Sequence, residues 1–273
     1  MFVTFAPAPR VSIVIPTYNR LACLAELFEC LSRQTFWDFE VVAVNDAGAS
    51  LDEVAALYPE LDVRVIDLPV NGRQAKAINA GVAAARGELI MLCDDDDLLA
   101  PCHLARMVAN MADADLAYAD AEIFGFSQEA STRVVGDRHV WAHDFDLGVQ
   151  DRYLTVIPSG TVYRKAIHDA IGPMDTDLPC YWDWDFVLRL AHAGFRVKRV
   201  PAASVAYAFG THNTTADHRA NQPYLDLLAA KHGLVGLRTS NFSLLLQEPE
   251  LQETRRETRR VWDGEIRPSR LAG

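Results

Sequence analysis

The first hundred residues contain four apolar runs with the length and composition of strands. Two of them, residues 11–16 and 39–46, are continuous and rich in β-branched residues, which is typical of strands buried on both faces. The other two cover residues 63–69 and 88–93. We therefore expect four strands in this part of the chain.

Segments with helical character separate these strands. Residues 21–34 place leucines and a phenylalanine three or four positions apart, on one face of a helix. Further helices are expected at residues 51–58, at residues 73–86 before Gly87, and at residues 101–112, where a proline suits the first turn. Strands that alternate with helices predict an α/β fold, with a Rossmann-like, mostly parallel sheet and helices on both faces.

The second half of the chain is less regular. We expect strands at residues 115–124 and 195–201, and a helix opened by acids at residues 180–194. Residues 125–158 show no clear periodicity and are predicted to be irregular. The tail from about residue 216 has helical character, and it ends in an arginine-rich stretch.

Polar residues follow each of the first four predicted strands. In parallel α/β sheets, ligands bind at the carboxyl ends of the strands, near a switch in strand order. We therefore expect these polar segments to converge on one edge of the sheet. They are residues 16–19, 45–46, 71–73 and 94–97.

The segment Asp94–Asp97 places four carboxylates directly after a predicted buried strand. A solvated turn would explain two adjacent acids, but four like charges repel one another strongly. Hard oxygen ligands suit Mg²⁺ or Mn²⁺, and Mg²⁺ shares its coordination shell with substrate phosphates. The sequence therefore favours a metal–phosphate site over a solvated turn.

No glycine-rich phosphate loop accompanies these acids, because neither G-x-x-x-x-G-K-[ST] nor G-x-G-x-x-G occurs. Side chains and a metal ion would then have to hold a nucleotide. Arg73, at the start of a predicted helix, is suited to contact a diphosphate with two hydrogen bonds. The alternative is an ordinary surface arginine.

Composition narrows the class of protein. The chain has 273 residues, of which 50% are hydrophobic and 23% are charged, as in soluble globular enzymes. A net charge of −11 argues against nucleic-acid binding, which requires a basic surface. The five cysteines include no C-x-x-C pair and are expected to be reduced core residues. With no secretory signal and no apolar run approaching about 20 residues, we expect a cytoplasmic protein.

Four segments together resemble glycosyltransferase family 2. They are "VSIVIPTYNR", "LSRQTFWDFEVVAVNDAG", "NGRQAKAINAGVAAARGELIMLCDDDDLLAP" and "YWDWDFVLRLAHAGFRVKRV". The resemblance covers roughly residues 10–215 and implies the GT-A fold and inverting transfer from a nucleotide-sugar. It divides residues 1–215 into a nucleotide-sugar half, about 10–110, and an acceptor half, about 111–215. Residues 216–273 then form a helical extension.

The resemblance also assigns roles to single residues in the donor half. Pro16, Thr17 and Tyr18 match the turn that lines the nucleobase pocket. Asp46 matches the acid that hydrogen-bonds the base, usually uracil, which implies a UDP-sugar donor. Arg73 matches the basic residue near the diphosphate.

The acids after the fourth strand match the family's D-x-D region. We take Asp96 as the direct metal ligand, with Asp94 or Asp95 nearer the donor sugar and ribose, and Asp94 as a second candidate ligand. The metal would be Mn²⁺ or Mg²⁺. His212 lies where some relatives bring a late histidine toward the metal or diphosphate, although an ordinary loop histidine is the alternative.

The segment "YWDWDF" matches the motif that carries the catalytic base. Asp183 takes the position of the base, while Trp182 stands where the family more often has glutamate. Asp185 is the rival for this role. Acids favour a first helical turn, so we interpret Asp185 as a helix-capping residue.

The arginine-rich end, residues 253–273, has two interpretations. One is a solvated helix in which Glu253 and Glu257 pair with Arg256 and Arg260. The other is a patch that contacts anionic lipid at the inner face of the membrane, or a partner or second copy of the chain.

The sequence therefore predicts a metal-dependent inverting glycosyltransferase. Its acceptor is an unidentified saccharide, lipid-linked molecule or small molecule. A sugar nucleotidyltransferase is the enzymatic alternative, but that class usually has a glycine-rich loop after the first strand, and "IPTYNR" has no glycine. A non-catalytic binding protein on the same fold is the other alternative.

Overall fold

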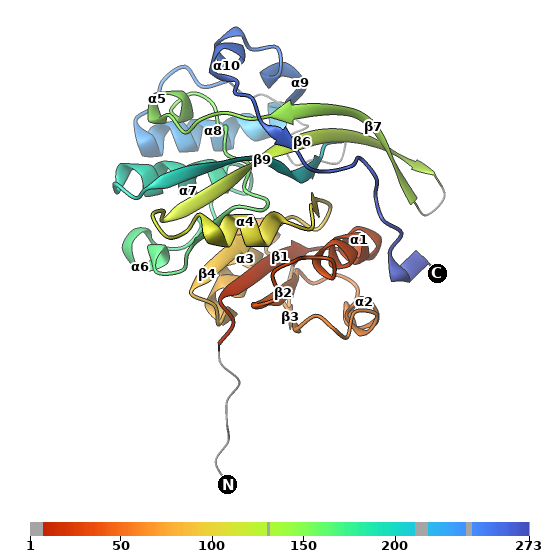
Figure 1. Cartoon of the computed structure of the whole chain (residues 1–273). Coiled ribbons are helices and arrows are strands. Elements are labelled where there is room, and N and C mark those ends of the chain that lie inside the picture. The colour runs from red at the N-terminus through yellow and green to blue at the C-terminus, as the bar shows by residue number, and fades with distance from the viewer. Residues whose placement is uncertain (1–7, 130–131, 211–217, 239–241, 273) are drawn as a thin grey trace.

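The computed structural model describes residues 8–129, 132–210, 218–238 and 242–272. Strands and helices alternate through the first half, as the sequence predicts (Figure 1). The elements in chain order are β1 (Val11–Thr17), α1 (Leu21–Leu31), β2 (Phe39–Asn45), α2 (Asp52–Ala56), β3 (Val63–Asp67), α3 (Arg73–Ala84), β4 (Leu89–Leu92), β5 (Leu98–Leu99), α4 (His103–Ala109), β6 (Leu116–Glu129), β7 (Thr132–Trp141), α5 (Leu147–Gln150), β8 (Val162–Arg164), α6 (Ile167–Ile171), α7 (Trp182–His192), β9 (Val197–Ala208), α8 (His218–His232), α9 (Phe242–Leu245), α10 (Pro249–Thr254), β10 (Arg259–Arg260) and the short 3₁₀ helix Arg270–Ala272.

One large sheet runs through the molecule in the order β10-β9-β6-β8-β4-β1-β2-β3. Strands β3, β2, β1 and β4 are parallel to one another. Strand β8 lies antiparallel between β4 and β6, and β6, β9 and β10 are again parallel. The expected α/β fold with a large, Rossmann-like sheet is therefore confirmed, with β8 antiparallel near its centre and with β5 and β7 paired antiparallel to β9 and β6.

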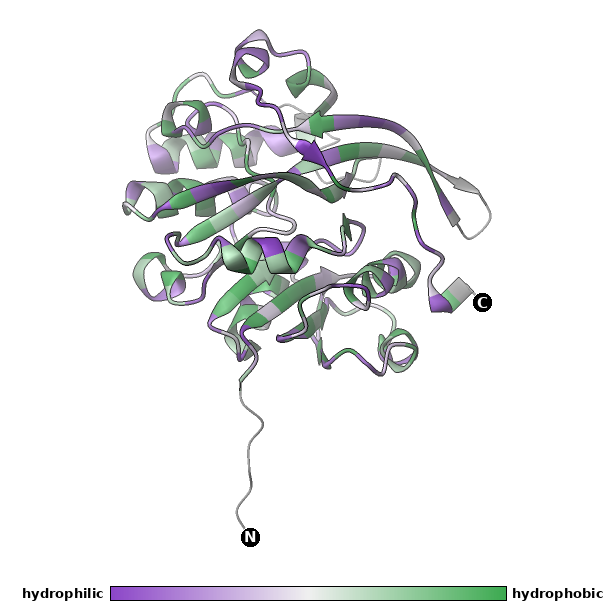
Figure 2. Cartoon of the chain, viewed as in Figure 1, coloured by the Kyte–Doolittle hydropathy of each residue, from purple (hydrophilic) through white to green (hydrophobic). Residues whose placement is uncertain are grey.

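Strand β1 is mostly apolar on both faces, because helices pack on each of them. Ile13 and Ile15 belong to the core cluster that includes α1, whereas Val14 belongs to the cluster that includes α3. A Cβ atom added to Gly81 of α3 would lie 2.5 Å from Val14 Cγ1, so α3 approaches β1 closely only because this residue is glycine. Figure 2 shows β1 as mostly hydrophobic.

The prediction that residues 125–158 are irregular was wrong for the first part of that range. Strand β7 forms a long antiparallel hairpin with β6. Two of its arginines make internal ion pairs, Arg133 with Glu26 and Arg138 with Glu122. Inward-facing charges interrupt the alternation of apolar and polar residues, so the strand pattern was hidden in the sequence.

The tail is helical only as far as α10. The following residues are extended, and β10 pairs with β9 at the edge of the sheet. Arg260 pairs with the buried Glu122 rather than with Glu253 or Glu257, and Arg256 pairs with Asp144. The predicted solvated helix is therefore wrong for this segment, because acids from elsewhere in the fold bind its arginines.

After β10 the chain crosses back to the first half of the molecule, and the C-terminus lies near α1 and α2 (Figure 1). Trp262 packs on Phe124, with ring centroids 5.1 Å apart. Arg270 lies over the ring of Tyr58 at 4.5 Å and pairs with Glu60. We call residues 255–272 the C-terminal strap.

Two further expectations concern the state of the cysteines and the length of the apolar segments. All five cysteines are free, and Cys93 and Cys180 are buried. Within the described ranges, no helix combines the length and apolarity needed to cross a membrane.

Packing of the C-terminal strap predicts a loss of stability in Trp262→Ala. The substitution removes the contacts of the indole with Phe124 and with the guanidinium of Arg138, 4.6 Å from the ring centroid. We expect the free energy of unfolding to fall by about 2 kcal/mol, measured by urea denaturation. Trp37→Ala is the matched control, because Trp37 is 51% exposed and should cost clearly less. Equal losses in the two variants would contradict a packed strap.

Candidate active site

A pocket of about 400 Å³ lies at the carboxyl ends of β1, β2 and β4, between this edge of the sheet and the start of α7. All the donor-half residues to which the resemblance assigns a role line it, and so does the candidate base. These residues are Pro16, Thr17, Tyr18, Asp46, Arg73, Asp94, Asp95, Asp96 and Asp183. His212 lies outside the described residues.

Hydrogen bonds tie the strand ends together, as the sequence predicts. The Thr17 hydroxyl donates to Asp95 Oδ2 at 2.6 Å, which joins the end of β1 to the loop after β4. The amide of Asp46 donates to the carbonyl of Thr17 at 2.9 Å, which joins the loop after β2 to β1. The polar segments therefore converge at one edge of the sheet.

Asp46 holds the turn that leads into α3. Its two carboxylate oxygens accept hydrogen bonds from the amides of Gly72 and Arg73 at 2.7 and 2.8 Å. Arg73 has a φ of 66°, in the left-handed region that non-glycine residues rarely adopt. The two bonds to Asp46 stabilise this conformation and place Arg73 at the pocket. The carboxylate therefore has a structural partner, and its contact with a nucleobase stays a prediction.

The acids after β4 separate into two groups. Asp94, Asp95 and Asp96 line the pocket. Asp97 is fully buried, and its Oδ1 accepts a hydrogen bond from the amide of Ala208 at 2.7 Å. Asp97 therefore supports the end of β9, while the other three present carboxylates to a ligand.

Crowding of these carboxylates changes their acid–base properties. Burial and the charges of Asp96 and Asp95 raise the pKa of Asp94 to about 8. Burial and the charge of Asp96 raise the pKa of Asp95 to about 6, although Arg20 and Thr17 oppose this shift. Burial first, and the neighbouring negative charges second, thus disfavour the ionised form of Asp94, and a nearby cation would favour it.

Arg20 supplies part of that positive charge. Its Nη1 lies 2.6 Å from Asp96 Oδ2 and 3.2 Å from Asp95 Oδ1. Burial lowers the pKa of the guanidinium, but the two carboxylates outweigh burial and raise it. The single positive charge of Arg20 offsets only part of the charge of the three carboxylates, so the pocket remains negative at this end.

This donor set fits a divalent ion that is shared with a ligand. The carboxylates are hard oxygen donors, which suit Mg²⁺ or Mn²⁺. Within the described ranges, no group of three or more His, Cys, Asp or Glu side chains is arranged to hold a metal by itself. An ion here would therefore be bound by one or two of these carboxylates and completed by water and phosphate oxygens.

Asp183 reaches the pocket from the start of α7. Helix α7 begins at Trp182, and the residue before the helix, Tyr181, has a φ of 77°. Asp183 Oδ1 accepts a hydrogen bond from the amide of Trp184 at 2.9 Å. Burial raises the pKa of Asp183 to about 6, despite backbone hydrogen bonds that lower it. A carboxylate with this pKa is suited to accept a proton near neutral pH.

Asp185 has a different environment, although it belongs to the same helical turn. Its side chain is fully buried and contacts Arg189, Lys231 and His232 at 2.8, 2.7 and 2.9 Å. Burial alone would raise its pKa, but these hydrogen bonds and charges lower it to about 2. Asp185 therefore joins α7 to α8 and does not cap the helix, which corrects the interpretation from the sequence.

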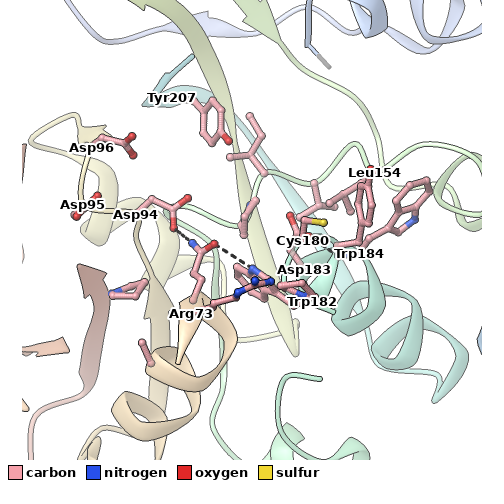
Figure 3. A pocket seen from close by; sticks show the side chains of 18 of the residues that line it. Arg73, Asp94, Asp95, Asp96, Leu154, Cys180, Trp182, Asp183, Trp184 and Tyr207 are labelled. Carbon is pink, nitrogen blue, oxygen red and sulfur yellow. Dashed lines mark hydrogen bonds between the residues drawn. The ribbon is translucent and has the colours of Figure 1, made fainter. Parts of the chain in front are cut away.

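Near the acids, sequence reasoning missed Arg20, Gln74 and Tyr207, which also line the pocket. Arg20 directly follows the first converging loop, and Gln74 directly follows Arg73, so both could have been found from neighbouring positions. Gln74 donates to Asp94 Oδ1 at 2.6 Å and accepts from Trp182 Nε1 at 3.2 Å, and Figure 3 marks both bonds. Tyr207 comes from the end of β9, and no signal pointed to it because that strand was expected to end earlier.

Comparison with known proteins agrees with this arrangement. Residues 12–172 match the family described as glycosyl transferase family 2. A Bacillus subtilis (strain 168) protein named "Uncharacterized glycosyltransferase YwdF" is 48% identical over 265 residues, covering 96% of this chain and 98% of the relative. A Mycobacterium bovis (strain BCG / Pasteur 1173P2) protein named "PGL/p-HBAD biosynthesis glycosyltransferase" is 32% identical over 225 residues, 77% of this chain and 82% of the relative.

Solved structures give the same fold. Residues 1–349 of S. aureus TarS, in complex with UDP-GlcNAc, match with a TM-score of 0.65 and 20% identity over 81% of this chain and 66% of that one. The chain thus matches about two thirds of that fragment. The mannosyltransferase PcManGT of Pyrobaculum calidifontis, in complex with GDP-Man and Mn²⁺, matches with a TM-score of 0.62 and 20% identity over 91% of this chain and 70% of that one.

At this level of identity the solved structures establish the fold alone, and they confirm the expected GT-A architecture. The family is established by the match over residues 12–172 and by the relatives of 48% and 32% identity. The chain belongs to glycosyltransferase family 2.

Proposed function

We propose that this protein transfers a sugar from a nucleoside-diphosphate sugar, preferentially a UDP-sugar, to an acceptor hydroxyl with inversion at the anomeric carbon. The observation that carries this proposal is the composition of the pocket. A cluster of carboxylates suited to a metal–diphosphate lies on one side, and Asp183 lies on the other (Figure 3). Leaving group and general base would then act from opposite faces of the sugar.

The donor end of the pocket has the groups that a nucleoside diphosphate requires. Tyr18 is 49% exposed and presents its ring at the rim, where a nucleobase would stack. Arg73 offers a guanidinium for the diphosphate. TarS binds UDP-GlcNAc and PcManGT binds GDP-Man on the same fold, which supports a nucleotide-sugar donor.

Asp96 and Asp94 would hold a Mn²⁺ or Mg²⁺ ion against the diphosphate. When bound, the ion supplies positive charge that stabilises the departing nucleoside diphosphate. Arg20 now neutralises part of the charge on Asp96 and would share the carboxylates with the ion. The Mn²⁺ in the PcManGT complex supports this part of the proposal.

Asp183 acts as the general base. An acceptor hydroxyl is a weak nucleophile, and removal of its proton as it attacks the anomeric carbon lowers the barrier. The hydrogen bonds that lower the pKa of Asp183 come from backbone amides and not from a cationic side chain, so the carboxylate keeps its affinity for this proton. A single displacement from the face opposite the leaving group inverts the anomeric configuration and needs no covalent sugar–enzyme intermediate.

The location of the protein and its contacts beyond the substrates stay predictions. The expected lipid or partner patch would use arginines of the C-terminal strap. Two of these, Arg256 and Arg260, pair with carboxylates of the protein body, which reduces the positive charge available to an anionic lipid. A cytoplasmic enzyme remains our expectation, and peripheral contact with the membrane or a second copy remains the alternative interpretation of its arginine-rich end.

Replacement of the base tests the mechanism. Asp183→Asn keeps the shape of the side chain but cannot accept the proton, so we expect transfer to fall by about 10²- to 10⁴-fold. Affinity for UDP should stay near wild type, because Asp183 lies across the pocket from the acids. Transfer is measured as release of nucleoside diphosphate at saturating donor, with an acceptor that the wild-type protein uses. UDP affinity is measured by calorimetry.

Asp185→Asn is the matched control, since it makes the same change two residues away. It weakens the buried contacts with Arg189, Lys231 and His232, so we expect a loss of about 3 kcal/mol in the free energy of unfolding. The folded variant should keep most of its transfer rate. An active Asp183→Asn enzyme beside an inactive, folded Asp185→Asn enzyme would reverse the assignment.

The pKa of Asp183 predicts the pH dependence of transfer. Because burial raises this pKa to about 6, the base is ionised above pH 6 and becomes protonated below it. The transfer rate should therefore be level above this pH and fall about tenfold per pH unit below it. A rate that stays constant down to pH 5 would show that another group accepts the proton.

Removal of a carboxylate tests the metal site. In Asp96→Ala, the gain in UDP affinity that Mn²⁺ provides should fall by at least about 10- to 100-fold. Removal of a group that only supports a metal ligand already lowers metal affinity by about this factor. Asp52→Ala is the control, because Asp52 is exposed on α2 and does not line the pocket. Calorimetry with UDP, with and without Mn²⁺, measures the effect. Unchanged Mn²⁺ dependence in Asp96→Ala would contradict the assignment.

A further inference from the structure

The end of the pocket beyond Asp183 differs in composition from the donor end. Its walls come from the loop before β8, from the start of α7 and from α9. We call this set of side chains the apolar wall. It consists of Tyr153, Leu154, Ile157, Trp184, Phe242 and Leu245. In Figure 3, Leu154 and Trp184 lie on the side of the pocket away from Asp94, Asp95 and Asp96.

The indole of Trp184 has its hydrogen-bond partner within the protein, whereas Tyr181, whose ring centroid lies 6.1 Å from that of Trp184, adds a phenol hydroxyl to this end. Trp184 Nε1 donates to the carbonyl of Gln150 at 2.6 Å. Burial and the charges of Glu248 and Glu250 raise the pKa of the Tyr153 hydroxyl. Trp184, Phe242 and the aliphatic side chains of the wall therefore offer ring faces and carbon atoms to a ligand.

Basic side chains lie only at the margin of this end among the described lining residues. Arg152 is half exposed and pairs with Glu250, and Arg238 is exposed. Tyr207 lies on the acid side, where its pKa is raised by burial and by the charges of Asp97 and Asp94. Asp183 is thus the polar group that marks the boundary between the two ends.

This composition is unfavourable for a free sugar. A buried hydroxyl without a hydrogen-bond partner costs about 1 to 3 kcal/mol. A saccharide carries several hydroxyl groups, and the apolar wall offers few partners for them. The same wall would gain free energy from every methylene or aromatic carbon that it removes from water.

We propose that the acceptor carries its hydroxyl on or beside an apolar body, an alkyl or aromatic group, which packs on the apolar wall while the hydroxyl meets Asp183. This inference rests on the proposed glycosyl transfer and names the chemical class of its acceptor. A free saccharide, with no such body, would bind this end weakly.

Two ligands with the same head group test this directly. Methyl β-D-glucoside and hexyl β-D-glucoside differ only in the apolar aglycone, and neither needs a donor to bind. We expect hexyl glucoside to bind at least about tenfold more tightly, because burial of two extra methylene groups is worth about that factor. Titration calorimetry below the micelle concentration measures both. Phenyl β-D-glucoside then distinguishes an aromatic body from an alkyl one.

Variants locate the preference in the pocket. Leu154→Ser and Leu245→Ser each place a hydroxyl in the apolar wall and should lower the hexyl-to-methyl affinity ratio several-fold. Leu244→Ser is the matched control, because Leu244 belongs to the same short helix but is 52% exposed and does not line the pocket. UDP affinity should be unchanged in all three.

Equal affinity for the methyl and hexyl ligands would overturn the proposal. So would a hexyl preference that persists in both wall variants or disappears equally in the control, because the apolar body would then bind elsewhere. Failure of the proposed function looks different. The wild-type protein would bind no UDP-sugar and release no nucleoside diphosphate, while a hexyl preference located by the variants would still establish the apolar site.

Discussion

Repulsion among the carboxylates after β4 is the constraint on which the rest of the site depends. Asp94, Asp95 and Asp96 meet at one strand end, where burial weakens their contact with water. The surrounding structure offsets this cost only in part. Thr17 donates to Asp95, and Arg20 contacts Asp95 and Asp96. The charge that remains is what the proposed cation, and the anionic group that it would bring, is expected to offset.

Different local partners explain how two aspartates on α7 come to differ in pKa. Asp183 and Asp185 are two residues apart in sequence, yet their pKa values are raised to about 6 and lowered to about 2. Burial acts on both. At Asp185, hydrogen bonds from His232, Lys231 and Arg189 outweigh it, together with the charge of Arg189, whereas only backbone hydrogen bonds oppose it at Asp183. One aspartate therefore fastens two helices together, and the other keeps a proton affinity suited to catalysis.

Much of this arrangement could be predicted from the sequence, for identifiable reasons. Strand β1 is apolar on both faces because helices pack on each face, so its composition reveals that it lies inside the sheet. The polar residues after β1, β2 and β4 converge because parallel strands end at the same edge. The β6–β7 hairpin escaped prediction because Arg133 and Arg138 face inward, which requires acids whose proximity only the fold supplies. The C-terminal strap was misread for the same reason, since Arg260 is bound by Glu122 and not by a neighbour in sequence.

The central claim is that one pocket holds a metal-bound nucleoside diphosphate on the acid side, with Asp183 facing it. A crystal structure with UDP and Mn²⁺, using the anomalous signal of manganese to locate the ion, tests this most directly. The account predicts a manganese peak in contact with Asp96 and the diphosphate, and UDP extending past Arg73 toward Tyr18. A peak away from the acids, or UDP bound against Trp184 and Leu154, would contradict it.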